Sequence, residues 1–327
     1  MAETVFISGA TGFIAQHIVK LLISKGYHVV GSVRSTAKGE KLKQNVNSEN
    51  FSYEIVEDLE SVGAFDAALK KHPEVTIFLH TASPVTFAEN DVEKEILLPA
   101  INGTKNVLKA IKAQAPQITK LVITASIVSV DSVGSKSVDE TSFNSITWEE
   151  SKTSGFAAYA GSKTFAEKAA WEFIETEKPN FTLSTIHPVY VFGPQAYGVD
   201  GELNFSNTVV SKLLQLKPGA EVPVTIGSFI DVRDVAESHL VAFEKEGAAG
   251  QRFILTNSRF SNQTLLDIIN ANIPELKGKI TEGIPGSQTP TPTTINDKKT
   301  REFLDFKYID LKKSVVDTIE QYISSQK

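Results

Sequence analysis

The sequence predicts an α/β fold, with a doubly wound parallel sheet and a smaller, discontinuous C-terminal lobe. Two observations predict it. Up to residue 187, short runs rich in β-branched residues alternate with segments of helical periodicity, which is typical of parallel strands joined by helices. After that point, Gly- and Pro-rich segments interrupt shorter elements, which indicates a separate and smaller unit.

The elements of the main sheet follow from local patterns. Residues 4–8 form an apolar run that predicts the first strand. The helix after it has its apolar residues on one face, at Ile14, Ile18, Leu21 and Leu22. Further strands are predicted at residues 28–33, 51–56, 75–80, 121–125 and 182–187. The intervening segments are long enough for one helix each, so we expect helices on both faces of the sheet.

The smaller lobe is predicted to be interleaved with the main domain. Breaks occur at Gly193-Pro194, at Lys217-Pro218-Gly219 and in a Thr/Pro-rich stretch at residues 283–294. Residues 231–245 nevertheless have a helical apolar face, and we expect this helix to return to the main sheet. The predicted division is a main domain of residues 1–190 plus about 229–246, and a lobe of residues 191–228 and 247–327.

Composition excludes several classes of protein. Hydrophobic residues at 41% and charged residues at 22% are globular values. The net charge of −6, without clustered Lys or Arg, argues against nucleic-acid or membrane-surface partners. With no cysteine there is no disulfide framework or thiolate site. Because no signal peptide or apolar span is evident, we expect a cytoplasmic location. We also expect a monomer or homodimer, a small-molecule carbonyl substrate and no metal.

A glycine-rich turn follows the first predicted strand, in the order Gly9-Ala10-Thr11-Gly12-Phe13-Ile14-Ala15. The first glycine suits a tight turn, and the second lets a pyrophosphate approach the backbone at the start of a helix. An isolated match of this kind is also compatible with a purely structural turn. Its place between the first strand and the first helix favours a dinucleotide site of the Rossmann type.

Residues at the ends of the next strands point to the kind of dinucleotide. Where an NAD site usually has Asp or Glu after the second strand, this chain has Arg34 and then Lys38. Two cations without a carboxylate suit a 2′-phosphate, so NADP is the predicted cofactor. Asp58 and Leu59 are expected at the adenine, and the cofactor is expected to pass Thr81, Ala82 and Ser83.

A tyrosine and a lysine four residues apart suggest acid–base chemistry. Tyr159 and Lys163 open a helical segment at residues 162–174, and residues with this spacing share a helix face. A nearby ammonium is expected to lower the pKa of the phenol. Tyr308 and Lys312 have the same spacing but no strand-borne partner, and we interpret them as a solvated helix edge. Ser126, at the carboxyl end of the fifth strand, is expected to meet Tyr159.

Longer strings carry a resemblance to a known family. They are Ser8-Gly-Ala-Thr-Gly-Phe-Ile-Ala-Gln-His17, His80-Thr-Ala-Ser-Pro84, Lys163-Thr-Phe-Ala-Glu-Lys-Ala-Ala-Trp-Glu-Phe173, Pro188-Val-Tyr-Val-Phe-Gly-Pro-Gln195 and Ile230-Asp-Val-Arg-Asp-Val-Ala236. The chain resembles an extended short-chain dehydrogenase/reductase almost from end to end. Within that family it is similar to the yeast NADPH-dependent methylglyoxal reductase/3-methylbutanal reductase group, relatives of plant dihydroflavonol reductases.

The resemblance implies roles for individual residues. Tyr159 would protonate the substrate carbonyl oxygen, Ser126 would hydrogen-bond it, and Lys163 would hold the nicotinamide ribose. It also implies cofactor contacts from Gly9, Ala10, Thr11, Gly12, Phe13, Ile14, Arg34, Lys38, Asp58, Leu59, Thr81, Ala82, Ser83, Tyr159, Lys163, Pro188, Val191 and Ser206. A substrate pocket would be lined by Phe87, Ile127, Phe156 and Tyr190; ordinary core packing is the alternative for these four residues.

Two departures from the yeast group bear on the substrate. The resemblance places tyrosine at position 127, where this chain has Ile. The loop at residues 131–156 also diverges. We therefore expect a different pocket wall from that of the yeast reductases.

The predicted function is an NADPH-dependent carbonyl reductase that converts aldehydes or ketones into alcohols. Its expected substrates resemble methylglyoxal, branched aldehydes or prochiral ketones. One alternative is a nucleotide-sugar epimerase or dehydratase that retains NAD, which the missing acidic residue after the second strand disfavours. A second is a non-catalytic NADP-sensing protein, which the complete set of Ser126, Tyr159 and Lys163 disfavours.

Overall fold

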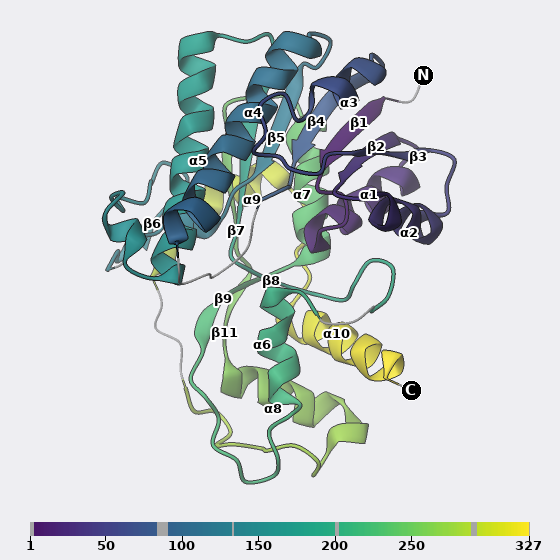
Figure 1. Ribbon diagram of the computed structural model, residues 1–327. Coiled ribbons are helices and arrows are strands. Elements are labelled where there is room, and N and C mark those ends of the chain that lie inside the picture. The colour runs from purple at the N-terminus through teal and green to yellow at the C-terminus, as the bar shows by residue number, and fades with distance from the viewer. Residues whose placement is uncertain (1–2, 84–90, 133, 200–202, 289–292, 327) are drawn as a thin grey trace.

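A parallel sheet forms the larger part of the molecule (Figure 1). The computed structural model describes residues 3–83, 91–132, 134–199, 203–288 and 293–326. Within them, seven strands are ordered β10-β7-β5-β4-β1-β2-β3, and every neighbouring pair is parallel. The strands are β1 (Thr4–Ser8), β2 (His28–Val33), β3 (Phe51–Ile55), β4 (Val75–His80), β5 (Lys120–Thr124), β7 (Thr182–Pro188) and β10 (Arg252–Leu255). The doubly wound sheet predicted from the alternating pattern is confirmed.

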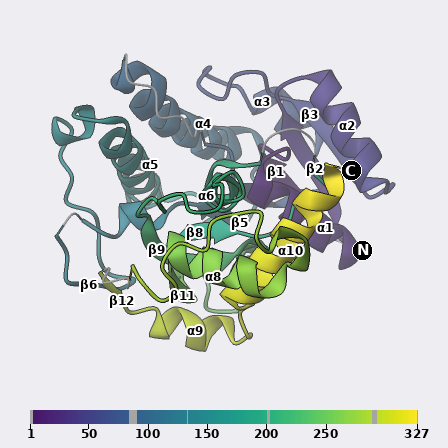
Figure 2. The same ribbon diagram turned by 90° about the horizontal axis from the view of Figure 1, so that it is seen from below.

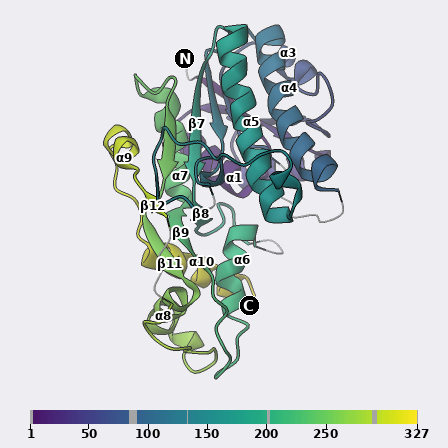
Figure 3. The same ribbon diagram turned by 90° about the vertical axis from the view of Figure 1, so that its left-hand side faces the viewer.

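Helices cover both faces of this sheet (Figure 3). The five residues of β1 are all buried, and their side chains alternate between two cores. Val5 and Ile7 belong to the core under α1 (Phe13–Ser24) and α7 (Val232–Glu244). Phe6 belongs to the opposite core, which α3, α4 and α5 cover. The helices of that face are α3 (Asp66–Lys71), α4 (Leu98–Gln114) and α5 (Gly155–Glu177), and α2 (Thr36–Val46) follows β2.

A smaller lobe lies at the carboxyl ends of the strands (Figure 1). Its sheet has the order β11-β9-β8, with β8 (Tyr190–Phe192), β9 (Ile226–Asp231) and β11 (Ser258–Ser261). The helices α6 (Phe205–Leu213), α8 (Asn262–Asn272) and α10 (Leu311–Ser325) complete it. Phe192, Phe229 and Phe260 form its aromatic core. Helices α8 and α10 pack against each other (Figure 2).

Several short elements complete the structure. A two-stranded sheet joins β6 (Ser137–Val138) to β12 (Thr294–Ile295), and α9 (Lys298–Leu304) packs on β10. Single turns occur at η1 (Glu93–Leu97), η2 (Ile127–Ser129), η3 (Glu150–Lys152) and η4 (Pro274–Leu276). Among the described residues, no helix is both long and apolar enough to cross a membrane.

Two sequence-based boundaries need correction. Residues 247–327 were expected in the smaller lobe, but β10 pairs with β7 at the edge of the large sheet, with Arg252 opposite Thr185. A strand of four residues whose partner is distant in sequence leaves little local signal. Helix α5 also begins well before residue 162, because the Ser154 hydroxyl caps it by accepting a hydrogen bond from Ala157 N at 3.1 Å.

Candidate active site

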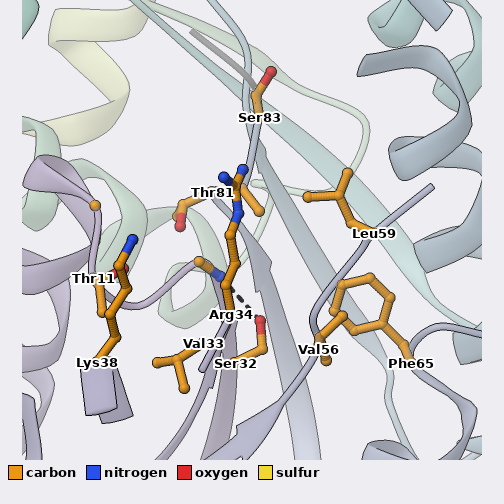
Figure 4. Close-up of a pocket in the computed structure, with 13 residues that line it drawn as sticks. Thr11, Ser32, Val33, Arg34, Lys38, Val56, Leu59, Phe65, Thr81 and Ser83 are labelled. Atoms are coloured by element: carbon orange, nitrogen blue, oxygen red, sulfur yellow. Dashed lines mark hydrogen bonds between the residues drawn. The ribbon is translucent and has the colours of Figure 1, made fainter. Parts of the chain in front are cut away.

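A cavity of about 230 Å³ opens where the strand order reverses between β1 and β4 (Figure 4). Ligands of doubly wound sheets bind at this switch point, beyond the carboxyl ends of the strands. The cavity is lined by Gly9, Thr11, Gly12, Ser32, Val33, Arg34, Lys38, Val56, Leu59, Phe65, Thr81, Ala82 and Ser83. Nine of these residues were sequence-predicted contacts, and they come from the ends of four strands.

Gly9 is required by the geometry of the turn. It adopts φ +67°, and a Cβ there would lie 3.0 Å from both Cα and Cβ of Ala82. Gly9 N donates to Ser32 Oγ at 3.0 Å, and Gly12 N donates to Gly9 O at 2.9 Å. Helix α1 then begins at Phe13, and no side chain of the described residues caps it. Its first N–H groups are therefore available to an anion.

The two ends of the cavity differ in character (Figure 4). Val56, Leu59 and Phe65 gather on one side of Arg34, while Lys38 stands beside Thr11 on the other. The lining contains two cations and no carboxylate. Val56 and Phe65 were not predicted as site residues, although Val56 ends a predicted strand and could have been found by that position. The arrangement offers apolar surface for a flat ring system and positive charge for a phosphate.

Four predicted cofactor residues near the turn lie outside the cavity lining. Ala10 is fully buried and its N–H donates to Ser32 O at 2.9 Å, so it supports the turn from beneath. Phe13 and Ile14 are half-buried and pack against the core under α1. Asp58 turns its carboxylate toward Ser61 Oγ, at 2.7 Å, and Glu60 N, at 2.9 Å.

Ser126 and Tyr159 come together as predicted. Tyr159 Oη donates to Ser126 Oγ at 3.4 Å. Ser126 follows β5 and caps the turn η2, since its Oγ also accepts from Val128 N. Lys163 is 8% exposed and stands one helical turn beyond Tyr159 in α5. Within the described part of the chain, no residue accepts a hydrogen bond from its ammonium.

The electrostatics of the pair differ from the expectation. Burial raises the pKa of Tyr159, an effect that the hydrogen bond with Ser126 opposes only in part. Burial also lowers the pKa of Lys163 to about 8. The predicted lowering of the tyrosine pKa is therefore wrong for the structure as described, because desolvation of the phenolate outweighs stabilising contacts. At neutral pH Tyr159 holds its proton.

His80, the last residue of β4, contacts Ser8, the last residue of β1. His80 Nδ1 lies 2.8 Å from Ser8 Oγ, which in turn accepts from the N–H groups of Thr81 and Ala82 at 3.1 Å. Burial lowers the pKa of His80 to about 3, and the charge of Lys163 adds to this. A neutral imidazole thus fixes the backbone of the cavity wall.

The remaining predicted residues are distributed around the junction of the two parts. Pro188 and Val191 are buried, and Ser206 lies in the first turn of α6. Tyr190 stacks edge-to-face on Phe260, Ile127 is half-buried, and Phe156 is 57% exposed. Phe87 lies outside the described residues.

The second Tyr-x-x-x-Lys pair is not a solvated helix edge. Tyr308 is only 7% exposed and precedes α10, whereas Lys312 is exposed. Arg301 stacks on the ring of Tyr308, with its guanidinium carbon 4.6 Å from the ring centroid. The interpretation failed because the ring packs against α9 rather than lying on α10.

Comparison with known proteins identifies the family. A family model described as the NAD dependent epimerase/dehydratase family matches residues 5–255. The chain belongs to this family. It is thereby an extended short-chain dehydrogenase/reductase, as the sequence strings predicted.

Several similar proteins, both curated and solved, are named as reductases. The chain is 52% identical to a putative NADPH-dependent methylglyoxal reductase of Candida albicans, covering 98% of this chain and 99% of that protein. It is 44% identical to the NADPH-dependent methylglyoxal reductase of Saccharomyces cerevisiae, covering 98% of both. A crystal structure of Gre2 from Candida albicans in complex with NADPH has a TM-score of 0.96 and 48% identity, covering 99% of this chain and 100% of that one.

Proposed function

We propose that this protein is an NADPH-dependent carbonyl reductase, which reduces aldehydes and ketones to alcohols. The observation that carries the proposal is the contact of 3.4 Å between Tyr159 Oη and Ser126 Oγ, with Lys163 one helical turn away. Two hydroxyl groups at one point can bind a carbonyl oxygen, and one of them can protonate it. The names of the relatives that cover nearly the whole chain agree with this chemistry.

The residues of the cavity fit NADPH. Gly9 leaves room beside Ala82 that a Cβ would fill, at the start of a helix with unpaired N–H groups. We assign the diphosphate to this turn and the 2′-phosphate to Arg34 and Lys38. We assign the adenine to the apolar side formed by Val56, Leu59 and Phe65. Lys163 is buried and has no acceptor among the described residues, and we assign it to the ribose hydroxyls of the nicotinamide end.

The reaction divides between cofactor and protein. NADPH supplies the hydride. Tyr159 supplies the proton to the carbonyl oxygen, and its raised pKa keeps that proton in place at neutral pH until negative charge develops on the substrate oxygen. The Ser126 hydroxyl orients the same oxygen, and the Lys163 ammonium stabilises the phenolate that forms.

The proposed substrates are small carbonyl compounds with apolar groups, such as methylglyoxal, branched aldehydes and prochiral ketones. Tyr190, Ile127 and the exposed Phe156 carry apolar surface near the catalytic pair and remain the proposed pocket residues. Phe156 lies in the first turn of α5, one turn before Tyr159. We also propose a cytoplasmic location. We propose that the protein is a monomer or homodimer, and light scattering on the purified protein would test this oligomeric state.

The family also contains enzymes that retain NAD during epimerisation or dehydration. Arg34 and Lys38, in a lining without a carboxylate, disfavour NAD as the resident cofactor. The discriminating experiment measures oxidation of NADPH and NADH against methylglyoxal, branched aldehydes, diketones and aryl ketones, with chiral analysis of the alcohols. We expect substrate-dependent oxidation of NADPH and little of NADH. Tightly bound NAD in the purified protein, with no oxidation of NADPH, would support the epimerase alternative instead.

A further inference from the structure

The helix that carries Tyr159 and Lys163 also buries a carboxylate. Glu167 follows Lys163 by one more turn of α5, and its side chain is 1% exposed. Residues spaced by four lie on one helix face, so the carboxylate stands in line with the proposed catalytic pair. It does not line the cavity, and the proposed reaction gives it no role.

One oxygen of this carboxylate is joined to Ser126 through a single residue. Glu167 Oε2 accepts from Ser129 Oγ at 2.6 Å. Ser129 Oγ also lies 2.8 Å from the carbonyl oxygen of Ser126, and Ser129 N donates to that oxygen at 3.0 Å. Ser129 is fully buried in the turn η2 that Ser126 caps. Helix α5 is therefore fastened to the turn that holds the Ser126 hydroxyl.

The other oxygen faces the sheet, and Arg252 contacts both oxygens, because its Nη2 also donates to Oε2 at 3.2 Å. Glu167 Oε1 accepts from Arg252 Nε at 2.7 Å and from Trp171 Nε1 at 3.1 Å, and it lies 2.9 Å from His187 Nε2. Arg252 in turn donates to the carbonyl oxygens of Glu140 and Ser142. Burial would raise the pKa of Glu167, but the contacts with His187 and Arg252 hold it well below its usual range. The carboxylate is thus charged and held by groups from three elements.

A buried ion pair of this kind is a poor source of stability, because the cost of removing both charges from water offsets their attraction. It can instead fix one arrangement of the elements that it joins. Here it joins α5, which holds Tyr159, to η2, which Ser126 caps.

We infer that Glu167, acting through Ser129, is a positioning residue that sets the Ser126 hydroxyl against Tyr159. The inference rests on the proposed carbonyl reduction. Neither Glu167 nor Ser129 touches the substrate; both act on the distance between the two hydroxyl groups that bind its oxygen.

The test removes the link without removing the buried charge pair. Ser129→Ala deletes the hydroxyl between Glu167 and Ser126. We expect kcat with methylglyoxal to fall roughly 10- to 100-fold, as small displacements of catalytic groups do, with an unchanged Kd for NADPH. The matched control is Thr185→Val, because Thr185 Oγ1 donates to Oε1 of the same carboxylate, on the side away from Ser126. The control should retain the kcat of the wild type.

A double-mutant cycle separates positioning from general loosening of the fold. If Ser129 acts through Ser126, then Ser129→Ala should cost almost nothing in a Ser126→Ala background. Two results would overturn the inference while leaving the proposed function intact. One is a double variant whose loss of kcat equals the product of the losses in Ser129→Ala and Ser126→Ala, and the other is a Ser129→Ala enzyme as active as the wild type. A wild-type protein that oxidises no NADPH in the same assay would overturn both.

Discussion

The hydroxyl groups of Tyr159 and Ser126 lie 3.4 Å apart, although 33 residues separate them in the chain. Ser126 is placed by the end of β5 and Tyr159 by the second turn of α5. The two meet because β5 ends at the carboxyl edge of the sheet, where α5, which covers one face, contacts the turn η2. The proposed chemistry depends on this meeting.

Removing the phenol should abolish the reaction and spare cofactor binding. For Tyr159→Phe we expect kcat to fall by roughly 10²–10⁴, the usual worth of a general acid. NADPH binding, measured by fluorescence titration, should change little, since the phosphate-binding part of the cavity is untouched. Full activity in this variant would rule out Tyr159 as the proton donor.

The chain supplies its own control for that experiment. Tyr308 and Lys312 have the same spacing, and Tyr308 Oη has no hydrogen-bond partner in the described part of the chain. Tyr308→Phe should therefore retain both activity and denaturant midpoint. A comparable loss of kcat would show that the effect at Tyr159 is not specific to the site.

Arg34 should bind the 2′-phosphate of the cofactor. We expect Arg34→Asp to raise the KM for NADPH about 100-fold, as loss of a charge-assisted pair worth ~3 kcal/mol would. The KM for NADH should change far less. Lys43→Asp changes the net charge equally on an exposed position of α2 outside the cavity lining, and it should change neither KM. Equal losses for both cofactors in Arg34→Asp would contradict the assignment.

The turn at Gly9 should tolerate no side chain. Gly9→Ala forces a left-handed alanine, at a cost of ~1–2 kcal/mol, and also presses on Ala82 from 3.0 Å. Gly26 has φ +87° with nothing within 4 Å of the position that a Cβ would take, so Gly26→Ala carries the backbone cost alone. Urea unfolding should show Gly9→Ala to be the less stable, and only Gly9→Ala should weaken NADPH binding. Similar behaviour of the two variants would mean that the contact with Ala82 is unimportant.

The buried ammonium of Lys163 should lower the free energy of unfolding. Burial lowers its pKa from 10.5 to about 8, so a buried charge worth about 3 kcal/mol opposes folding at pH 7. Below pH 8 both states carry the charge and the cost is fully present. Between pH 8 and 10.5 the unfolded state binds more protons, so stability rises with pH. We therefore expect Lys163→Met to be inactive yet more stable than the wild type at pH 7, by a margin that shrinks toward pH 10.

The control for this prediction is Lys168→Met, since Lys168 is an exposed lysine of the same helix. It should show no such gain in the free energy of unfolding. A Lys163→Met protein that unfolds at the same urea concentration as the wild type at pH 7 would contradict the cost assigned to burial.

Much of the fold could be predicted because its signals are local. The strands β1, β2 and β4 have the predicted bounds, since apolar runs end at turn residues there. The edge strand β10 could not be found, because its four residues are defined by pairing with β7. The start of α5 was missed because Ser154 is followed by Gly155, and glycine is a poor helix former. In the structure, the cap formed by the Ser154 side chain outweighs the low helix propensity of this glycine.

The site was predictable to the extent that residue type implies chemistry. Arg34, Lys38 and the glycine turn were found by position after a strand, and the structure brings them to one cavity. The raised pKa of Tyr159 could not be read from the spacing to Lys163, because it depends on how deeply both groups are buried. The linkage of Glu167 to Ser129 is likewise a contact between distant segments.

Transfer of deuterium from the cofactor to the product would demonstrate carbonyl reduction by NADPH. The protein is incubated with methylglyoxal and NADPH carrying deuterium at the transferred position, and the alcohol product is analysed by mass spectrometry. We expect one deuterium on the former carbonyl carbon, with one NADPH consumed for each alcohol formed. Consumption of no NADPH, or an alcohol without deuterium, would contradict it.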